Sequence, residues 1–576
     1  MFKRKKESFY YPGVEIPVRS MDRYRCLDAV TISALQKARW RISFLIVFFG
    51  LCFLIILGKL FFLTIVDYEE RDFKPSVLRA DFEMERKNIL DRNGVLLATG
   101  VPTVDLSVNP KKVKNPEEVA KRIAAVLPDL SYQDVYDKLT ANGSFKYIKR
   151  NLTPAEQYEI NRLGYYFLTF TKGEKRIYPQ GNLFAHTIGT VNIDNIGTSG
   201  LEKQLNERLM QEDVQLSLDL TVQQIVHSYL SSGIQKYQAT GGGALVMDVQ
   251  TGEVLAMVSL PDYNPNILST ITKENGFNKN TLGVYEFGSV FKLFNTAMAL
   301  ENQDIEPWDS FDASEAYKIG RKAIEDYRGQ NRVLSVPEIL MHSSNIGSVH
   351  IALKSGAQKQ KEFLSRFGFF EQLPIEFPER GTPLYIKGKW PDITVANVAF
   401  GYSVSVTPLH LAAAVSSLVN GGFYHTPVFV KADHKPEIEY RVLSERTSNI
   451  MRALMWAVIN WEIPEGKPLL DYAIGGKTGS ANLLDENGKY VKRALRTTLA
   501  AAFPMNNPRY VVVAFLEHPK GIKETWNFNT AGWNAKPIVL DMIIQMASYL
   551  GVPAQNEMEL PGYVKRAIET SLTYKK

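Results

Sequence analysis

The longest apolar run in the chain lies near its start. ISFLIVFFGLCFLIILG at 42–58 continues past Lys59 as LFFLTIV, so the whole run covers 42–66. A run of this length can cross a bilayer with some tilt. It is too long for the core of a signal peptide and no small-x-small cleavage motif follows it, which predicts an uncleaved transmembrane anchor.

The charges on the two sides of this run have opposite sign. Basic residues such as Lys3, Arg4 and Arg39 precede it, whereas acidic residues begin directly after it at Asp67. Positively charged flanks stay in the cytoplasm. The sequence therefore predicts a basic cytoplasmic tail over 1–41 and export of everything after residue 66.

The exported part begins with a mixed region over 67–212. Within it, RNGVLLATG (92–100) has the Asn-Gly signal of a tight turn leading into a strand. TVDLSV (103–108) alternates like a half-buried strand, and TPAE (153–156) has the capping box and first-turn proline of a helix. No group of reactive side chains stands out here. This pattern favours a non-catalytic spacer or docking module, which we call the pedestal.

From residue 213 the apolar segments become longer. GGALVMDVQTGEVLAMVSL (242–260) is typical of two strands around a turn, and 495–503 with 509–518 form a second such pair. Helical spacing occurs between the two pairs. This order predicts an α+β domain over 213–552, in which strands from both ends share an antiparallel sheet with helices around it. Residues 553–576 are expected to form a C-terminal tail.

Composition narrows the classes of function. The 576 residues, 45% of them hydrophobic and 22% charged, can bury more than one core. A net charge of +6 is small for this length and does not indicate nucleic-acid binding. Cys26 and Cys52 both precede the exported part, so no disulfide is expected there. The scattered histidines form no metal-ligand motif, and we expect no metal and no cofactor.

One Ser-x-x-Lys pair offers a nucleophile and a base. Gly288 precedes Ser289, and VFKLFNTAMALE follows with helical character, so Ser289 should open a helix. Lys292, three residues later, then lies on the same face, where its amine can reach the hydroxyl. A serine attacks only if a neighbouring base takes its proton. An ordinary helix-capping serine beside a solvated lysine is the structural alternative.

Two further elements carry side chains suited to the same chemistry. HSSNIG (342–347) contains Ser343, which can relay a proton, and Asn345, which can hold a peptide carbonyl; by itself it is more typical of a turn or helix cap. GGKTGSA (475–481) brings Lys477, Thr478, Gly479 and Ser480: a positive charge, two hydroxyls and room for a ligand backbone. A competing Lys-Ser-Gly at 354–356 is better explained as the end of a helix with Gly356 at the cap.

In order, the three elements are Ser-x-x-Lys, Ser-x-Asn and Lys-Thr-Gly, the set found in penicillin-binding proteins and class A β-lactamases. The chain resembles a class B penicillin-binding protein of the division, FtsI-like type, from the anchor to about residue 550. Other segments that carry the resemblance are RKNILDRNGVLLA (86–98), RIYPQGNLFAHTIG (176–189), AFGYSVSVTPLHLA (399–412) and TAGWNAKP (530–537). Phe287 stands where the family usually has proline, and Lys87 where it usually has glycine.

The resemblance implies a peptidoglycan D,D-transpeptidase of the septum that forms an acyl-enzyme on Ser289 and is a target of β-lactams. Lys292 would be the general base, Ser343 would pass the proton to the leaving amine, and Asn345 would align the peptide. As base, Lys292 needs a lowered pKa, which burial beside Lys477 would supply.

The resemblance also assigns the donor site and the partners. Lys477 and Thr478 would receive the terminal carboxylate of a stem peptide, and the backbone amides of Ser289 and Ser480 would form an oxyanion hole. It implies an FtsW-like glycosyltransferase and other division proteins as partners, and an inner-membrane location with a periplasmic catalytic domain.

Other readings use the same residues. A β-lactamase or a penicillin sensor has the same serine. The anchor and pedestal argue against a β-lactamase. The short cytoplasmic part argues against a sensor, which would need cytoplasmic signalling machinery. A structural division protein with vestigial motifs has no need of all the reactive residues together.

Overall fold

The computed structural model describes residues 10–11, 14–15, 29–61, 86–431, 440–461, 471–484, 488–555 and 558–575. The chain divides into two compact units, Met1–Glu83 and Met84–Lys576. In the first unit, α1 (Ala29–Phe61) contains the stretch Arg39–Lys59, which is long and apolar enough to span a membrane. The pair β1 (Tyr10–Tyr11) and β2 (Val14–Glu15) precedes it. The described part of the expected anchor is therefore helical, while 62–66 lie outside the described residues.

The pedestal part of the second unit is built on one mixed sheet with the strand order β5-β4-β3-β7, and β6 also pairs with β4. Its strands are β3 (Ile89–Leu90), β4 (Leu96–Val108), β5 (Lys146–Leu152), β6 (Leu168–Ile177) and β7 (Val214–Gln215). Its helices are α2 (Pro116–Val126), α3 (Tyr132–Leu139), α4 (Pro154–Arg162), α5 (Ala185–Ile188) and α6 (Gly200–Gln204). The predicted turn at Asn93–Gly94 and the strand after it are confirmed, as is the capping box of Thr153 and Glu156.

A buried ion triad fastens the part of the pedestal around α6. Glu202 on α6 lies between two arginines: Arg86 Nη2 is 2.6 Å from Glu202 Oε2, and Arg176 Nε is 2.7 Å from Oε1. The three side chains are almost completely shielded from solvent. Because a buried charge is tolerated only when it is paired, this triad joins β6, α6 and the segment before β3 into one body.

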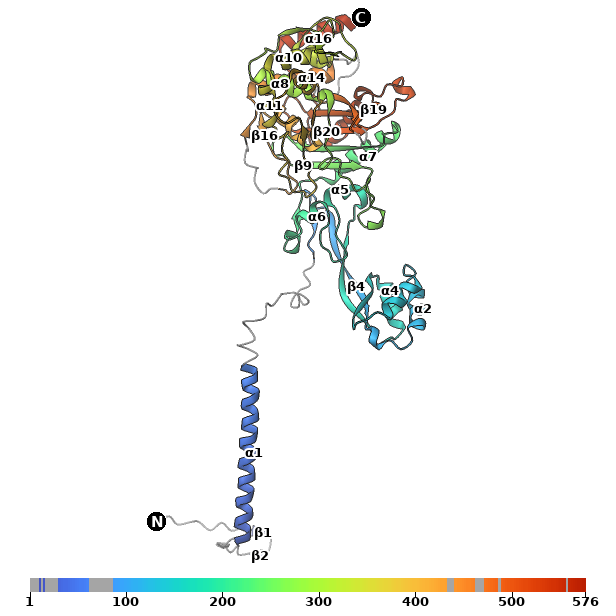
Figure 1. Ribbon diagram of the computed structural model, residues 1–576, viewed down its shortest axis with the longest axis vertical. Coiled ribbons are helices and arrows are strands. Elements are labelled where there is room, and N and C mark those ends of the chain that lie inside the picture. Colours follow the sequence, from blue (N-terminus) through green and yellow to red (C-terminus); the bar gives the residue numbers. More distant parts are fainter. Residues whose placement is uncertain are drawn as a thin grey trace, which may run out of the picture. The chain divides into compact units, whose positions relative to one another are not determined.

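The catalytic part is centred on a five-stranded antiparallel sheet with the order β18-β19-β20-β8-β9. The early strands are β8 (Gly241–Asp248) and β9 (Val254–Leu260), and the late ones are β18 (Gly475–Leu484), β19 (Tyr490–Phe503) and β20 (Tyr510–Glu517). The early strand β8 lies between β9 and the late strand β20, and Figure 1 shows β9 in green and β20 and β19 in orange to red. The predicted α+β domain with a sheet shared by its two ends is thus confirmed.

Helices cover both faces of this sheet. Along β8, Ala244 and Val246 face the core formed with α7 (Leu220–Lys236) and α15 (Ala535–Tyr549), whereas Leu245 and Met247 face the larger core. The larger core contains α8 (Lys292–Glu301), α9 (Val336–Met341), α10 (Asn345–Ser355), α11 (Ala357–Ser365), α12 (Asp392–Ala399), α13 (Pro408–Val419) and α14 (Glu445–Asn460). The alternation of side chains along one strand therefore serves two separate cores.

Short strand pairs lie outside the main sheet. They are β10 (Ser310–Asp312) with β13 (Val333–Ser335), β11 (Tyr317–Ile319) with β12 (Lys322–Ile324), β14 (Leu384–Tyr385) with β15 (Val404–Ser405), and β16 (Phe423–Tyr424) with β17 (Tyr440–Arg441). Residues 553–576, expected as a tail, include the helix α16 (Gly562–Lys575), whose Val564 and Ala567 are buried in the larger core.

Candidate active site

Ser289 lies in a tight helical turn that opens the central helix. The 3-10 helix η7 (Gly288–Phe291) leads directly into α8, and Lys292 is the first residue of α8. Ser289 is partly exposed, while Lys292 is completely buried. Phe287, which stands in the place of a family proline, is buried at the start of this turn. The predicted opening of a helix at Ser289 is confirmed, with a 3-10 turn as its first part.

The second element is a strained turn between two helices. α9 ends at Met341 and α10 begins at Asn345, and Ser344 caps α10 by accepting a hydrogen bond from Gly347 N. Ser343 has a φ of 56°, in the left-handed region that residues with a Cβ seldom adopt. Such a conformation persists only where the surroundings fix it, and it often marks a functional position.

The third element is carried by β18, which forms the edge of the sheet and faces the turn of Ser289. A Cβ on Gly479 would lie 2.1 Å from the Phe287 carbonyl oxygen, and one on Gly288 would lie 2.7 Å from the Ser480 carbonyl oxygen. Strand and turn can approach this closely only because both positions are glycine. β18 is the edge strand beside this turn, and alternate backbone groups of an edge strand are left unpaired within the sheet.

The hydroxyl of Ser343 brings two lysines together. Lys292 Nζ donates to Ser343 O at 2.5 Å, to Asn345 Oδ1 at 2.7 Å and to Ser343 Oγ at 3.1 Å. Lys477 Nζ donates to the same Ser343 Oγ at 3.0 Å and to Thr478 O at 3.1 Å. Residues from all three sequence elements therefore meet in one hydrogen-bonded network. The hydrogen bonds of the Lys292 amine go to this network, and none to the Ser289 hydroxyl occurs within the part of the chain described.

Burial makes both amines unusually acidic. Loss of solvation, followed by repulsion from Lys477, holds the pKa of Lys292 well below its usual value, with Asp326 acting in the opposite direction. Burial and repulsion from Lys536 lower the pKa of Lys477 to about 7. The expected depression of the Lys292 pKa by burial beside Lys477 is confirmed. An amine with a lowered pKa is neutral for part of the time near pH 7, and it can then accept a proton.

Asp326 is a residue of this region that the sequence analysis did not identify. Its carboxylate accepts hydrogen bonds from Ser344 Oγ at 2.7 Å, from Asn345 N at 2.5 Å and from Ile346 N at 3.1 Å. It thus caps the amino end of α10, where a negative charge is favourable. A single aspartate in a loop has no motif spacing that would have marked it in the sequence.

The hydroxyl of Ser480 and the competing Lys-Ser-Gly have structural settings of their own. Ser480 Oγ accepts a hydrogen bond from Ala531 N at 3.0 Å, which ties β18 to the segment before α15. Gly356 is the C-cap of α10 with a φ of 83°, as the sequence predicts. Lys354 is paired with Asp309 at 3.8 Å. Lys477 is therefore the lysine that contacts Ser343.

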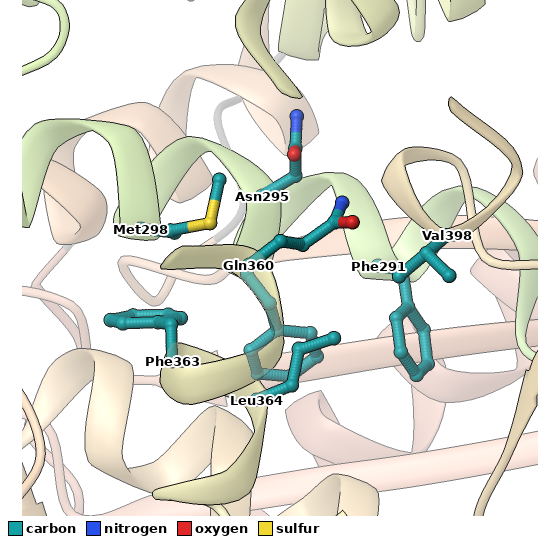
Figure 2. A pocket seen from close by; sticks show the side chains of 8 residues that line it. Phe291, Asn295, Met298, Gln360, Phe363, Leu364 and Val398 are labelled. Carbon is teal, nitrogen blue, oxygen red and sulfur yellow. The ribbon is translucent and has the colours of Figure 1, made fainter. Parts of the chain in front are cut away.

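A small cavity of about 10 Å³ lies between α8 and α11, lined by Phe291, Phe294, Asn295, Met298, Gln360, Phe363, Leu364 and Val398. Figure 2 shows the two amide side chains, Asn295 and Gln360, among apolar and aromatic groups. A volume of this size accommodates about one water molecule. A peptide substrate cannot enter it, so this cavity is not the substrate site.

Comparison with known protein families agrees with this architecture. Residues 242–542 match the penicillin binding protein transpeptidase domain, and residues 82–215 match the penicillin-binding protein dimerisation domain. The first match contains Ser289, Ser343 and Lys477 and covers more than half of the chain. The chain therefore belongs to the penicillin-binding protein transpeptidase family, as a class B member of the FtsI-like type.

Individual relatives are similar over most of their length. A probable peptidoglycan D,D-transpeptidase FtsI of Caulobacter vibrioides is 33% identical over 492 residues, which cover 83% of each chain. Stage V sporulation protein D of Bacillus subtilis is 30% identical over 573 residues, covering 90% of this chain and 88% of that protein. A solved peptidoglycan synthetase from Bifidobacterium adolescentis shares the fold with a TM-score of 0.64 at 21% identity, covering 82% of this chain and 97% of the other.

Proposed function

We propose that the chain is a septal peptidoglycan D,D-transpeptidase that cross-links stem peptides through an acyl-enzyme on Ser289, the serine that β-lactams also acylate. The observation that carries this proposal is the Ser343 hydroxyl shared by two buried lysines, one of them three residues from Ser289. The family match supports peptidoglycan as substrate and β-lactams as ligands. The FtsI name of the Caulobacter relative supports the role in division.

In the first half-reaction, neutral Lys292 takes the proton of the Ser289 hydroxyl. The Ser289 oxygen attacks the carbonyl carbon of the penultimate D-Ala, and a tetrahedral intermediate forms. When its C–N bond breaks, the proton passes from Lys292 through Ser343 Oγ, 3.1 Å away, to the departing nitrogen. Terminal D-Ala leaves as a free amine, and the rest of the stem stays as an ester on Ser289.

The donor peptide lies along the edge strand β18. The Lys477 ammonium and the Thr478 hydroxyl receive its terminal carboxylate, and Asn345 holds a peptide amide. The space that a Cβ of Gly479 would occupy is filled by the Phe287 carbonyl oxygen, so this glycine brings β18 close to the turn of Ser289, and the room for a ligand backbone expected from the sequence is not found there. The backbone amides of Ser289 and Ser480 donate to the oxyanion, and each such donor contributes about 3–4 kcal/mol in other serine acyl-transferases. Ser480 lies on β18 opposite η7, the turn that contains Ser289.

In the second half-reaction, the amine of a neighbouring stem peptide attacks the ester carbonyl. Lys292 takes the proton that this amine loses, and the C–O bond to Ser289 breaks. Ser289 regains its proton, and a new amide bond joins the two stems. Because the same base serves both halves in opposite directions, Lys292 must be able to change protonation state near neutral pH.

The anchor and the pedestal set the location of this chemistry. The apolar run that begins at residue 42, within the stretch Arg39–Lys59, anchors the chain as a single pass in the inner membrane, with the basic residues 1–41 in the cytoplasm. The catalytic part then faces the periplasm, where its substrate lies. An FtsW-like glycosyltransferase beside the anchor and other division proteins along the pedestal are the partners that the FtsI-like type implies.

The experiment is acylation by fluorescent penicillin of the full-length protein in detergent. The wild type is compared with Ser289→Ala and with Ser365→Ala, which removes an exposed serine on α11 as a matched control. We expect labelling of the wild type and of Ser365→Ala and none of Ser289→Ala. Absence of label on a folded wild type would indicate a structural protein with vestigial motifs. Rapid loss of the label would indicate a β-lactamase, whereas a stable adduct supports the transpeptidase.

A further inference from the structure

The C-terminal helix α16 packs directly behind the turn that carries Ser343. It lies outside residues 242–542, the part of the chain that matches the transpeptidase domain family. Val564, Ala567 and Ser571 are 0%, 4% and 2% exposed. Their spacing of three and four residues places them on one face of the helix. This face is therefore docked on the catalytic part.

One contact of α16 reaches the residue next to Ser343. Ser571 Oγ lies within hydrogen-bond distance, 3.0 Å, of His342 Nε2. On another side, the His342 ring meets the Trp461 ring edge-to-face, with centroids 4.7 Å apart and planes at 72°. Trp461 caps α14, so His342 is held between α14 and α16. Both helices thereby fix the residue that precedes Ser343 in the chain.

A second contact holds the opposite end of α9. The Arg332 guanidinium lies 4.4 Å from the centre of the Tyr574 ring and donates to Glu338 Oε1 at 2.7 Å. Glu338 Oε2 accepts hydrogen bonds from the N and Oγ of Ser335, and these two residues form the capping box of α9. α16 thus contacts the support of α9 at its beginning, through Arg332, and at its end, through His342.

The turn beyond α9 needs such support because its geometry is unfavourable by itself. Ser343 has a left-handed backbone conformation, which persists only where neighbouring groups fix it. From this conformation its hydroxyl contacts both Lys292 and Lys477. A shift of the turn would separate the hydroxyl from one of the amines.

We propose that α16 is a brace for the active-site turn, with Ser571 and His342 as positioning residues that hold Ser343 between the two lysines. The inference rests on the proposed function and deepens it, because it assigns a role in acylation to residues that do not touch the substrate. Ser571 acts through His342, and His342 acts through the backbone of Ser343. The brace determines how fast Ser289 is acylated and leaves the binding of penicillin before acylation unchanged.

The test uses the full-length protein with Ser571→Ala, the conservative Ser571→Thr, and Thr570→Ala as a matched control on the exposed face of α16. Stopped-flow acylation by fluorescent penicillin separates the limiting rate constant from the half-saturating concentration. For Ser571→Ala we expect a limiting rate about threefold to tenfold lower, the effect of one lost hydrogen bond. The half-saturating concentration should stay that of the wild type, and Ser571→Thr should restore the rate.

Equal limiting rates for Ser571→Ala and Thr570→Ala would overturn the brace. The same conclusion follows if Ser571→Thr is as slow as Ser571→Ala, because packing and not the hydroxyl would then control the rate. Melting temperatures are measured in parallel. A purely structural role of Ser571 would lower the melting temperature and leave the acylation rate unchanged at temperatures well below it. A wild type that takes no label contradicts the proposed function itself, which keeps the two failures apart.

Discussion

The Nζ atoms of Lys292 and Lys477 both donate a hydrogen bond to the Oγ of Ser343, at 3.1 and 3.0 Å. Two ammonium groups so close together repel each other, and burial deprives both of solvent. The arrangement is stable only if at least one of the amines is neutral for much of the time. One amine can then act as a base while the other retains charge for the substrate.

The pH dependence of acylation should follow from these two amines. Activity rises with pH as Lys292 loses its proton, at a pKa well below the usual lysine value. It falls again on the alkaline side as Lys477, with a pKa of about 7, loses the charge that attracts the substrate carboxylate. We expect a bell-shaped pH profile of the second-order rate constant for acylation, which is the limiting rate constant divided by the half-saturating penicillin concentration. A profile that is flat from about pH 6 to 10 would contradict these assignments.

Stability should depend on pH through Lys477 in a defined direction. Its pKa is about 7 in the folded protein and about 10.5 when unfolded, so the unfolded state binds more protons between these values. The loss of stability that the buried amine causes is largest below pH 7, and it disappears as the pH rises toward about 10.5. The melting temperature of the wild type should therefore rise relative to that of Lys477→Met over this range. Scanning calorimetry of both proteins from about pH 6 to 10 measures the difference; a constant difference would show that the pKa of Lys477 is not lowered in the folded protein.

Asp326→Asn should slow acylation and move its pH profile. The amide keeps most of the shape of the α10 cap but loses the charge, and a hydrogen bond to a charged group is worth about 1.5–3 kcal/mol, or roughly tenfold to hundredfold in rate. Because Asp326 raises the pKa of Lys292, its removal should shift the acidic limb to lower pH. Glu325→Gln, at the exposed neighbouring position, is the control. If the two variants behave alike, the cap has no part in catalysis.

Gly479→Ala should separate the edge strand from the turn of Ser289. The new methyl group would lie 2.1 Å from the Phe287 carbonyl oxygen, so either β18 or η7 has to move. We expect destabilisation of about 1–3 kcal/mol and loss of penicillin labelling. Gly532→Ala, where no atom lies within 4 Å of the added carbon, is the matched control and should label normally. Normal labelling of Gly479→Ala would mean that the close approach is not needed.

Glu202→Gln should weaken the pedestal and spare the chemistry. It leaves the guanidinium groups of Arg86 and Arg176 buried without their shared carboxylate, at a cost of about 3–5 kcal/mol. We expect faster proteolysis of the pedestal, with acylation at 25 °C close to that of the wild type. Glu207→Gln, on the exposed side of the same segment, should change neither quantity. A comparable loss of acylation would show that the pedestal supports the catalytic part directly.

The sequence identified most of the reactive residues because their chemistry needs fixed spacings. A serine and a lysine three residues apart share a helix face, and this relation is readable without a structure. Asp326 was not readable in this way: its partners are backbone amides and a hydroxyl 18 to 20 residues away, and only the folded chain brings them together. The left-handed backbone conformation of Ser343 likewise could not be predicted from the sequence HSSN.

The elements of the fold were predictable to a similar degree. Alternating and continuous apolar runs predicted the sheet strands, and the capping box at Thr153 predicted α4. The sequence did hold a signal for α16, since Val564, Ala567 and Ser571 follow helical spacing after Pro561 and Gly562. What the helix docks on could not be inferred, because its contacts are with residues more than two hundred positions earlier, such as His342.

The place of α16 after all the elements that it packs against has a consequence for biosynthesis. Val564 and Ala567 complete a core whose other members belong to segments made much earlier. The larger core therefore stays open on one side until α16 has left the ribosome. A chain released prematurely, even a few residues short of α16, would contain every reactive side chain and still lack the final piece of packing behind them.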